Sequence, residues 1–170
     1  DASGNASSLT LTTFVVDTTS PTAAITYDAV APFKNGDAAV TITATFNGPV
    51  LDSPVPTIAI AGSGIANVTS TNMTKVSTTV YTYSYAVPTG DGTGTVTVGT
   101  GTDAAGNTVT SVPTSGATFT VDNTAPTISA VTQVVTPSND TTPSYVFTTN
   151  EAGTITTNIT EGFSTSASAA

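Results

Sequence analysis

The amino-acid sequence predicts an all-β protein built as an antiparallel β-sandwich, and three observations support that prediction. Threonine is the most frequent residue, whereas Leu, Glu, Lys and Arg, the usual helix formers, are rare. Apolar and polar residues alternate along several short runs, which is typical of strands with one face in water. Turn-forming Gly, Pro, Asn and Asp separate these runs. About seven short strands between such turns indicate a sandwich of two sheets.

The alternating runs define the expected strands of one complete domain. In residues 40–46, apolar side chains alternate strictly with threonines. Residues 80–87 have apolar side chains on both faces, which predicts a central strand. The remaining expected strands contain, in chain order, the pairs Ile25 and Tyr27, Ile58 and Ile60, Val96 and Val98, and Phe119 and Val121.

The chain contains an internal repeat. The sequences DASGN (residues 1–5) and FVVDTTSPT (residues 14–22) recur as DAAGN (residues 103–107) and FTVDNTAPT (residues 119–127). The first pair is offset by 102 residues, from Asp1 to Asp103, and the second by 105, from Phe14 to Phe119. A loop insertion between two fixed strands produces such a difference, so the repeat unit is about one small domain.

Proline-containing turns at Pro21 and Pro126 set the expected domain boundaries, because proline suits a short, stiff linker. The predicted organisation has three parts: a closing strand and linker of a preceding or neighbouring unit in residues 1–20, a complete sandwich in residues 21–122, and the opening strands of a second, incomplete unit in residues 123–170.

Composition excludes several classes of function. The chain of 170 residues has 11 acidic and 2 basic side chains, a net charge of −9, and neither His nor Cys. Without an imidazole base, a thiolate or the usual zinc ligands, we expect no enzyme. The negative charge would repel a nucleic-acid backbone. No apolar run approaches the roughly 20 residues of a membrane span, so we expect no membrane insertion in this segment.

The motif DAAGN followed by FTVDNTAPT resembles the bacterial immunoglobulin-like repeats of large surface adhesins and extracellular stalk or filament proteins. The resemblance is specific in residues 103–127 and 1–22 and general in the composition of residues 40–98. It implies tandem immunoglobulin-like sandwiches, located on the cell surface or in secreted fibres, commonly with Ca²⁺ at or near the junctions between domains.

The repeat junctions also carry candidate metal ligands. The Asp103 carboxylate, loop carbonyls and the Asn107 amide oxygen could hold one Ca²⁺, and Asp122 is expected near the same end of the sandwich. Alternatively, Asp103 and Asn107 only shape a turn by bonding their own backbone. The equivalent N-terminal residues are Asp1, Asn5 and Asp17.

Both ends of the sequence are predicted to be parts of sandwiches, and two explanations stay open. Either the chain is a window from a longer tandem array, or copies join head to tail by β-strand complementation. In the second case the N-terminal strand completes the sandwich that begins at residue 123 of the next copy. The residues expected at this junction are Leu9, Leu11, Phe14 and Val16.

The sequence therefore predicts an extracellular structural protein, a repeat unit or subunit of a stalk, adhesin shaft or filament, whose partners are copies of itself or adjacent repeats. An alternative comes from Tyr81, Tyr83 and Tyr85, which share one face of a strand. Such a ladder could stack on sugar rings, which would make the chain a carbohydrate- or receptor-binding module that takes surface glycans. It could equally pack between the sheets.

Overall fold

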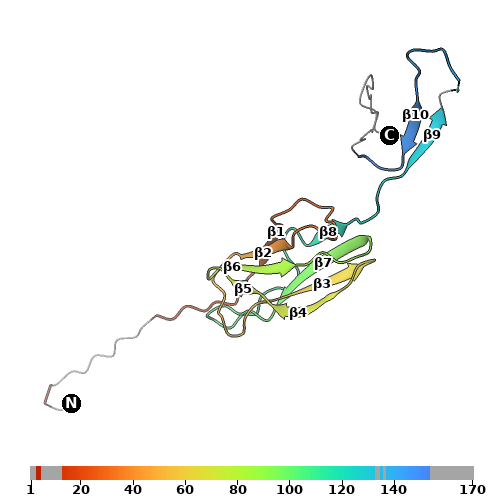
Figure 1. Cartoon of the computed structure of the whole chain (residues 1–170). Coiled ribbons are helices and arrows are strands. Elements are labelled where there is room, and N and C mark those ends of the chain that lie inside the picture. Colours follow the sequence, from red (N-terminus) through yellow and green to blue (C-terminus); the bar gives the residue numbers. More distant parts are fainter. Residues whose placement is uncertain (1–2, 5–12, 133–134, 136, 154–170) are drawn as a thin grey trace. The chain divides into compact units, whose positions relative to one another are not determined.

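A computed structural model describes residues 3–4, 13–132, 135 and 137–153 of the chain (Figure 1). The chain divides into two compact units, Asp1–Asn123 and Thr124–Ala170. In the described part of the chain, no helix is long and apolar enough to cross a membrane.

The first unit contains two four-stranded sheets in which all strand pairs are antiparallel, consistent with a β-sandwich. This arrangement confirms the all-β prediction. One sheet has the order β1 (Ala23–Tyr27), β2 (Val40–Phe46), β6 (Val80–Tyr85) and β5 (Thr74–Lys75). The other has the order β4 (Val68–Asn72), β3 (Thr57–Ser63), β7 (Gly92–Gly99) and β8 (Thr118–Val121).

Strand β2 shows why the alternating pattern predicts the sheet. Its apolar residues Val40, Ile42, Ala44 and Phe46 are buried, and the threonines between them are half-buried or exposed. β6 lies between β2 and β5, as expected for a central strand. The sequence did not predict β4 and β5, because these edge strands expose nearly all of their side chains and so show no apolar alternation.

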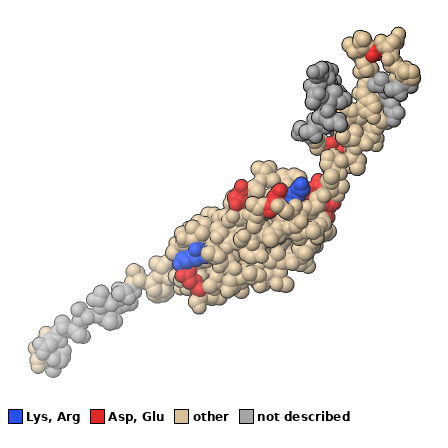
Figure 2. All heavy atoms as spheres, in the orientation of Figure 1, with Lys and Arg blue, Asp and Glu red and all other residues tan. Residues whose placement is uncertain are grey.

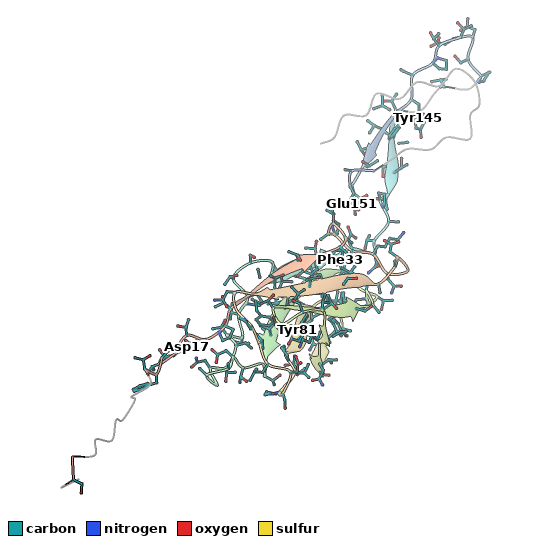
Figure 3. All side chains as sticks on the ribbon, turned by 90° about the vertical axis from the view of Figure 1, so that its left-hand side faces the viewer. Asp17, Phe33, Tyr81, Tyr145 and Glu151 are labelled. Atoms are coloured by element: carbon teal, nitrogen blue, oxygen red, sulfur yellow. The ribbon has the colours of Figure 1, made fainter. Side chains whose placement is uncertain are left out.

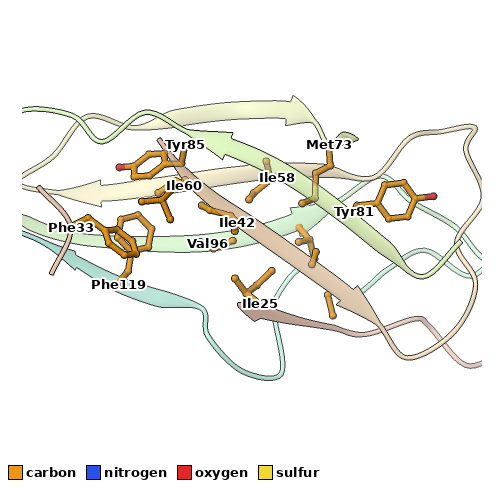
Figure 4. Close-up of a cluster of buried hydrophobic side chains, with 14 of the residues drawn as sticks. Ile25, Phe33, Ile42, Ile58, Ile60, Met73, Tyr81, Tyr85, Val96 and Phe119 are labelled. Atoms are coloured by element: carbon orange, nitrogen blue, oxygen red, sulfur yellow. The ribbon is translucent and has the colours of Figure 1, made fainter. Parts of the chain in front are cut away.

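The core lies between the two sheets, and an aromatic cluster fills one end of it (Figure 4). The Phe119 ring on β8 lies within 5.6 Å of the rings of Tyr27, Phe33 and Tyr85, measured between centroids. Edge-on and tilted contacts of this kind add to the hydrophobic gain from burial. Gly94 on β7 lies opposite Phe119, and its missing side chain leaves the space that the ring occupies.

The second unit contains a hairpin of β9 (Ile128–Thr132) and β10 (Val146–Thr149). Its first three residue pairs repeat the register of β1 and β2, with Ile128 opposite Thr149 as Ala23 is opposite Phe46, and the register then shifts between Val146 and Phe147. The residue before each hairpin is also held in the same way. The Thr22 N–H donates to the Asn47 side chain at 2.9 Å, and the Thr127 N–H donates to the Asn150 side chain at 2.6 Å.

The expected N-terminal closing strand is not formed in residues 13–20, which the structure shows as irregular. Phe14 and Val16 are 86% and 72% exposed. Their repeat equivalents Phe119 and Val121, on β8, are 4% and 2% exposed. β8 forms because β7 pairs with it, whereas residues 13–20 have no such neighbouring strand in the described structure. Leu9 and Leu11, also expected at the junction, lie outside the described residues.

Prediction: Phe119→Ala destabilises the sandwich by about 3–5 kcal/mol, because it removes a ring from a packed core. The same change at the repeat equivalent, Phe14→Ala, shifts stability by less than about 0.5 kcal/mol, because that ring is exposed. Urea denaturation of dilute protein, followed by circular dichroism, measures both values. Equal effects of the two substitutions would contradict the structure.

Candidate functional site

The loop of residues 103–107, here called the DAAGN loop, is closed by its own hydrogen bonds. One oxygen of the Asp103 carboxylate accepts the backbone N–H groups of Ala105 and Asn107, each at 2.9 Å. The other oxygen accepts the side-chain amide of Asn107, also at 2.9 Å. Gly106 has a φ of +89°, a conformation that favours glycine. The motif spacing therefore builds a tight, self-bonded turn, the alternative that sequence reasoning left open.

These bonds also set the electrostatics of the loop. The Asn107 side-chain amide, with further backbone N–H groups, holds the pKa of Asp103 below its ordinary value of 3.8. Hydrogen bonds to the charged form of a carboxyl favour that form. The Asp103 carboxylate is therefore an ionised anchor for the loop at neutral pH.

The DAAGN loop also contacts the chain that enters the sandwich. The Asn107 side-chain nitrogen donates to the backbone carbonyl of Asp17 at 3.1 Å, across 90 positions of sequence. The Asp17 carboxylate itself accepts the N–H of Thr19 at 2.9 Å, within the same linker. The structure thus brings Asp103 and Asn107 to the backbone of Asp17, a contact that the sequence did not predict.

Asp122 does not join this group, and the expectation that it lies near Asp103 is wrong. The N–H of Asp122 donates to the Phe33 carbonyl at 2.9 Å, and the following residue, Asn123, is hydrogen-bonded to Asp91. Asp91 precedes β7 and Asp103 follows it, so this eight-residue strand separates them by about 25 Å. Figure 3 shows Asp17 at one end of the sandwich and Phe33 near the other.

The candidate calcium site has few carboxylates among the described residues. Among the described residues, no group of three or more Asp or Glu side chains could hold a metal ion. The nitrogen of the Asn107 amide, rather than its oxygen, faces the Asp103 carboxylate. Asp1 and Asn5 of the equivalent N-terminal set lie outside the described residues. Calcium binding at the junctions stays a prediction.

The entry and exit of the sandwich are joined by a feature that sequence reasoning missed. Residues 21–33, here called the entry segment, run parallel to residues 110–122, the exit segment, with bridges from Ala24 to Ser115 and from Phe33 to Val121. The backbone bonds between them are Thr110 N–H to Pro21 O, Thr114 N–H to Ala23 O, Ile25 N–H to Ser115 O, Phe33 N–H to Thr120 O, and Asp122 N–H to Phe33 O, at 2.7–3.0 Å.

The tyrosine ladder faces the interior. Tyr81 and Tyr85 are 0% and 2% exposed, and Tyr83 packs against the core while partly buried. The Tyr81 hydroxyl donates to the Val50 carbonyl at 3.2 Å and to Asp52 at 3.1 Å. Stacking on a sugar needs an exposed ring face, so the ladder does not form the glycan-binding surface that we considered; it packs between the sheets.

Charge is sparse on the surface shown in Figure 2, where scattered acidic side chains interrupt an otherwise mostly uncharged face. One exposed ion pair joins Lys75 to Asp52 at 2.7 Å. An exposed pair of this kind contributes little to stability.

Comparison of the chain with protein-family models, curated proteins and solved structures finds no match.

Prediction: carboxyl NMR titration gives a pKa below 3.8 for Asp103, and Asn107→Ala raises it toward that value, because the amide donor is lost. Since the folded pKa is lowered, the contribution of Asp103 to stability is present above about pH 4 and is lost as the pH falls through the folded pKa.

Asp28 is the internal control for this titration. Its pKa is lowered by hydrogen bonds from Thr41, and it should not change in the Asn107→Ala variant. A pKa of Asp103 at or above 3.8 in the unmodified chain would contradict the loop geometry.

Proposed function

We propose that this chain is an extracellular structural protein, part of a cell-surface stalk, adhesin shaft or secreted filament. Its role is mechanical rather than catalytic, and its partners are adjacent repeats or copies of itself. The observation that carries this proposal is the parallel pairing of the entry and exit segments, which ties together the two places where a pulling force reaches the sandwich.

The strand order supports an immunoglobulin-like topology. In chain order, β1, β2, β5 and β6 match strands A, B, D and E, which form one sheet with the order A-B-E-D. Strands β3, β7 and β8 match C, F and G of the second sheet, and β4 is an added edge strand beside C. The motifs DAAGN and FTVDNTAPT, which resemble those of bacterial immunoglobulin-like surface repeats, support the same topology.

The geometry of the parallel pairing explains how the unit would resist extension. Tension enters at Asp17 and leaves at Asn123, near opposite ends of the sandwich. It pulls the entry and exit segments past each other along their length. The hydrogen bonds between them are therefore loaded together rather than one after another, and they must fail together before the core opens.

The second unit supports a tandem arrangement. The β9–β10 hairpin repeats the first three pairs of the β1–β2 register and its Thr–Asn hydrogen bond. It exposes Ile128, Val131 and Tyr145 by 60%, 59% and 48%. We assign this hairpin as the first two strands of a second sandwich, whose further strands would cover its apolar side chains.

Prediction: Gly116→Ala lowers the force needed to unfold the sandwich. Gly116 has a φ of +68°, and an added Cβ would overlap the carbonyl oxygen of Ile25, so the entry and exit segments must separate. Single-molecule stretching of the full chain by its ends measures the unfolding force.

Gly36→Ala is the matched control. Gly36 has a φ of +91°, but beyond its own chain neighbours no atom lies within 4 Å of the place that an added Cβ would take. Only the backbone strain of about 1–2 kcal/mol therefore remains. Equal losses of unfolding force in the two variants would show that the parallel pairing bears no particular load.

Strand complementation between copies is a second mode of assembly, favoured by the exposure of Phe14 and Val16, whose repeat equivalents are buried. In the complete sandwich, Phe119 contacts Tyr27 of the opening hairpin, with ring centroids 5.6 Å apart. By the repeat offset, Phe14 of one copy would then meet Thr132 of the next.

Prediction: a chain with Phe14→Cys and Thr132→Cys forms a ladder of covalent oligomers on mild oxidation. Because the native chain has no cysteine, every crosslink reports the introduced pair. A chain with Phe14→Cys and Val76→Cys is the control, since Val76 is 64% exposed on the first unit. Non-reducing electrophoresis measures both. Equal ladders, or none from the first pair, would contradict complementation by this strand.

A further inference from the structure

We infer that the DAAGN loop is a latch for the linker that arrives from the preceding unit, with Asn107 as the residue that holds it. The inference rests on the proposed tandem arrangement for its biological meaning. Its physical content is a defined contact between the loop and the backbone of Asp17.

The chemistry of the Asn107 amide supports a latch. A side-chain amide nitrogen has two hydrogens to donate. In Asn107 one donation goes to the Asp103 carboxylate at 2.9 Å and the other to the Asp17 carbonyl at 3.1 Å. The ionised Asp103 fixes which end of the amide faces it, because only the NH₂ end can donate to a carboxylate. The second hydrogen is thereby aimed at the linker.

The acceptor is a backbone carbonyl at a particular point of the repeat. Asp17 is the equivalent of Asp122, the residue that directly follows β8, the last strand of the complete sandwich. The DAAGN loop of one unit therefore holds the position at which the preceding unit ends. Because the acceptor is a backbone carbonyl, the latch depends on the path of the linker backbone and not on which side chain occupies position 17.

The latch extends the parallel pairing by one contact toward the preceding unit. Asp17 is held by Asn107, and the next contact, from Thr110 to Pro21, is 2.9 Å long. Residues 18–20 therefore lie between two fixed points, and the N–H of Thr19 is bonded within the linker. A linker fixed at both ends restricts the directions in which the preceding unit can bend.

The test is ¹⁵N relaxation of the full chain with Asn107→Ala. The substitution removes the side-chain donor but keeps the backbone N–H groups of residues 105 and 107 that close the loop on Asp103. We expect the order parameters of residues 17–20 to fall from the rigid range, about 0.85, to below about 0.6. Asn72→Ala, an exposed position on β4, is the matched control and should leave them unchanged.

A measurement on the unmodified chain keeps the test independent of how the variant folds. Both side-chain amide protons of Asn107 should exchange with water more slowly than those of the exposed Asn72. Two results would overturn the latch: unchanged order parameters of residues 17–20 in Asn107→Ala, or a side-chain amide proton of Asn107 that exchanges with water as fast as those of Asn72. Either result leaves the unfolding-force test of the mechanical role untouched, so the two proposals fail separately.

Discussion

The parallel contact between the entry and exit segments is the constraint on which the rest of the first unit depends. It joins residues about 90 positions apart and fixes where the chain enters and leaves the two sheets. Gly116 permits this close approach, because any side chain there would meet the backbone of Ile25. The aromatic cluster then packs against the same region, since Phe33 lies on the entry segment and Phe119 on the exit segment.

Packing and hydrogen bonding therefore reinforce each other at that end of the sandwich. The Phe33 backbone is bonded to Thr120 and Asp122, while its ring lies 5.3 Å from that of Phe119. Separating the two segments would expose these rings together with the backbone groups. Burial of aromatic rings and the cost of unpaired backbone groups both oppose that separation. This coupling ties the two four-stranded sheets together at that end.

Much of the fold could be predicted because burial leaves a period of two in the sequence. β2 shows it clearly and so was predicted with its faces. β6 was predicted as a central strand, but the direction of its tyrosine face was left open. β4 and β5 are exposed edge strands, and exposure removes the pattern. The position of Asp122 could not be derived, because alternation identifies strands but not the direction in which they cross the sandwich. The parallel contact was missed for the same reason, since a pattern along one segment says nothing of its partner.

The two linkers of the repeat show where the stiffness of a junction would originate. They share Val-Asp and the later Pro-Thr, but Thr18 stands where Asn123 follows Asp122. The Asn123 side chain accepts the N–H of Asn35 and donates to the Gly90 carbonyl, each at 2.6 Å, so it joins two loops at the exit. A threonine side chain is shorter and carries its donor and acceptor on one oxygen atom, so it cannot span the two loops as the amide does. At the entry, the corresponding hold comes from Asn107 on the receiving unit instead. The sandwich thus holds the incoming linker through Asn107 of its own loop. The outgoing linker instead holds the sandwich through its own Asn123.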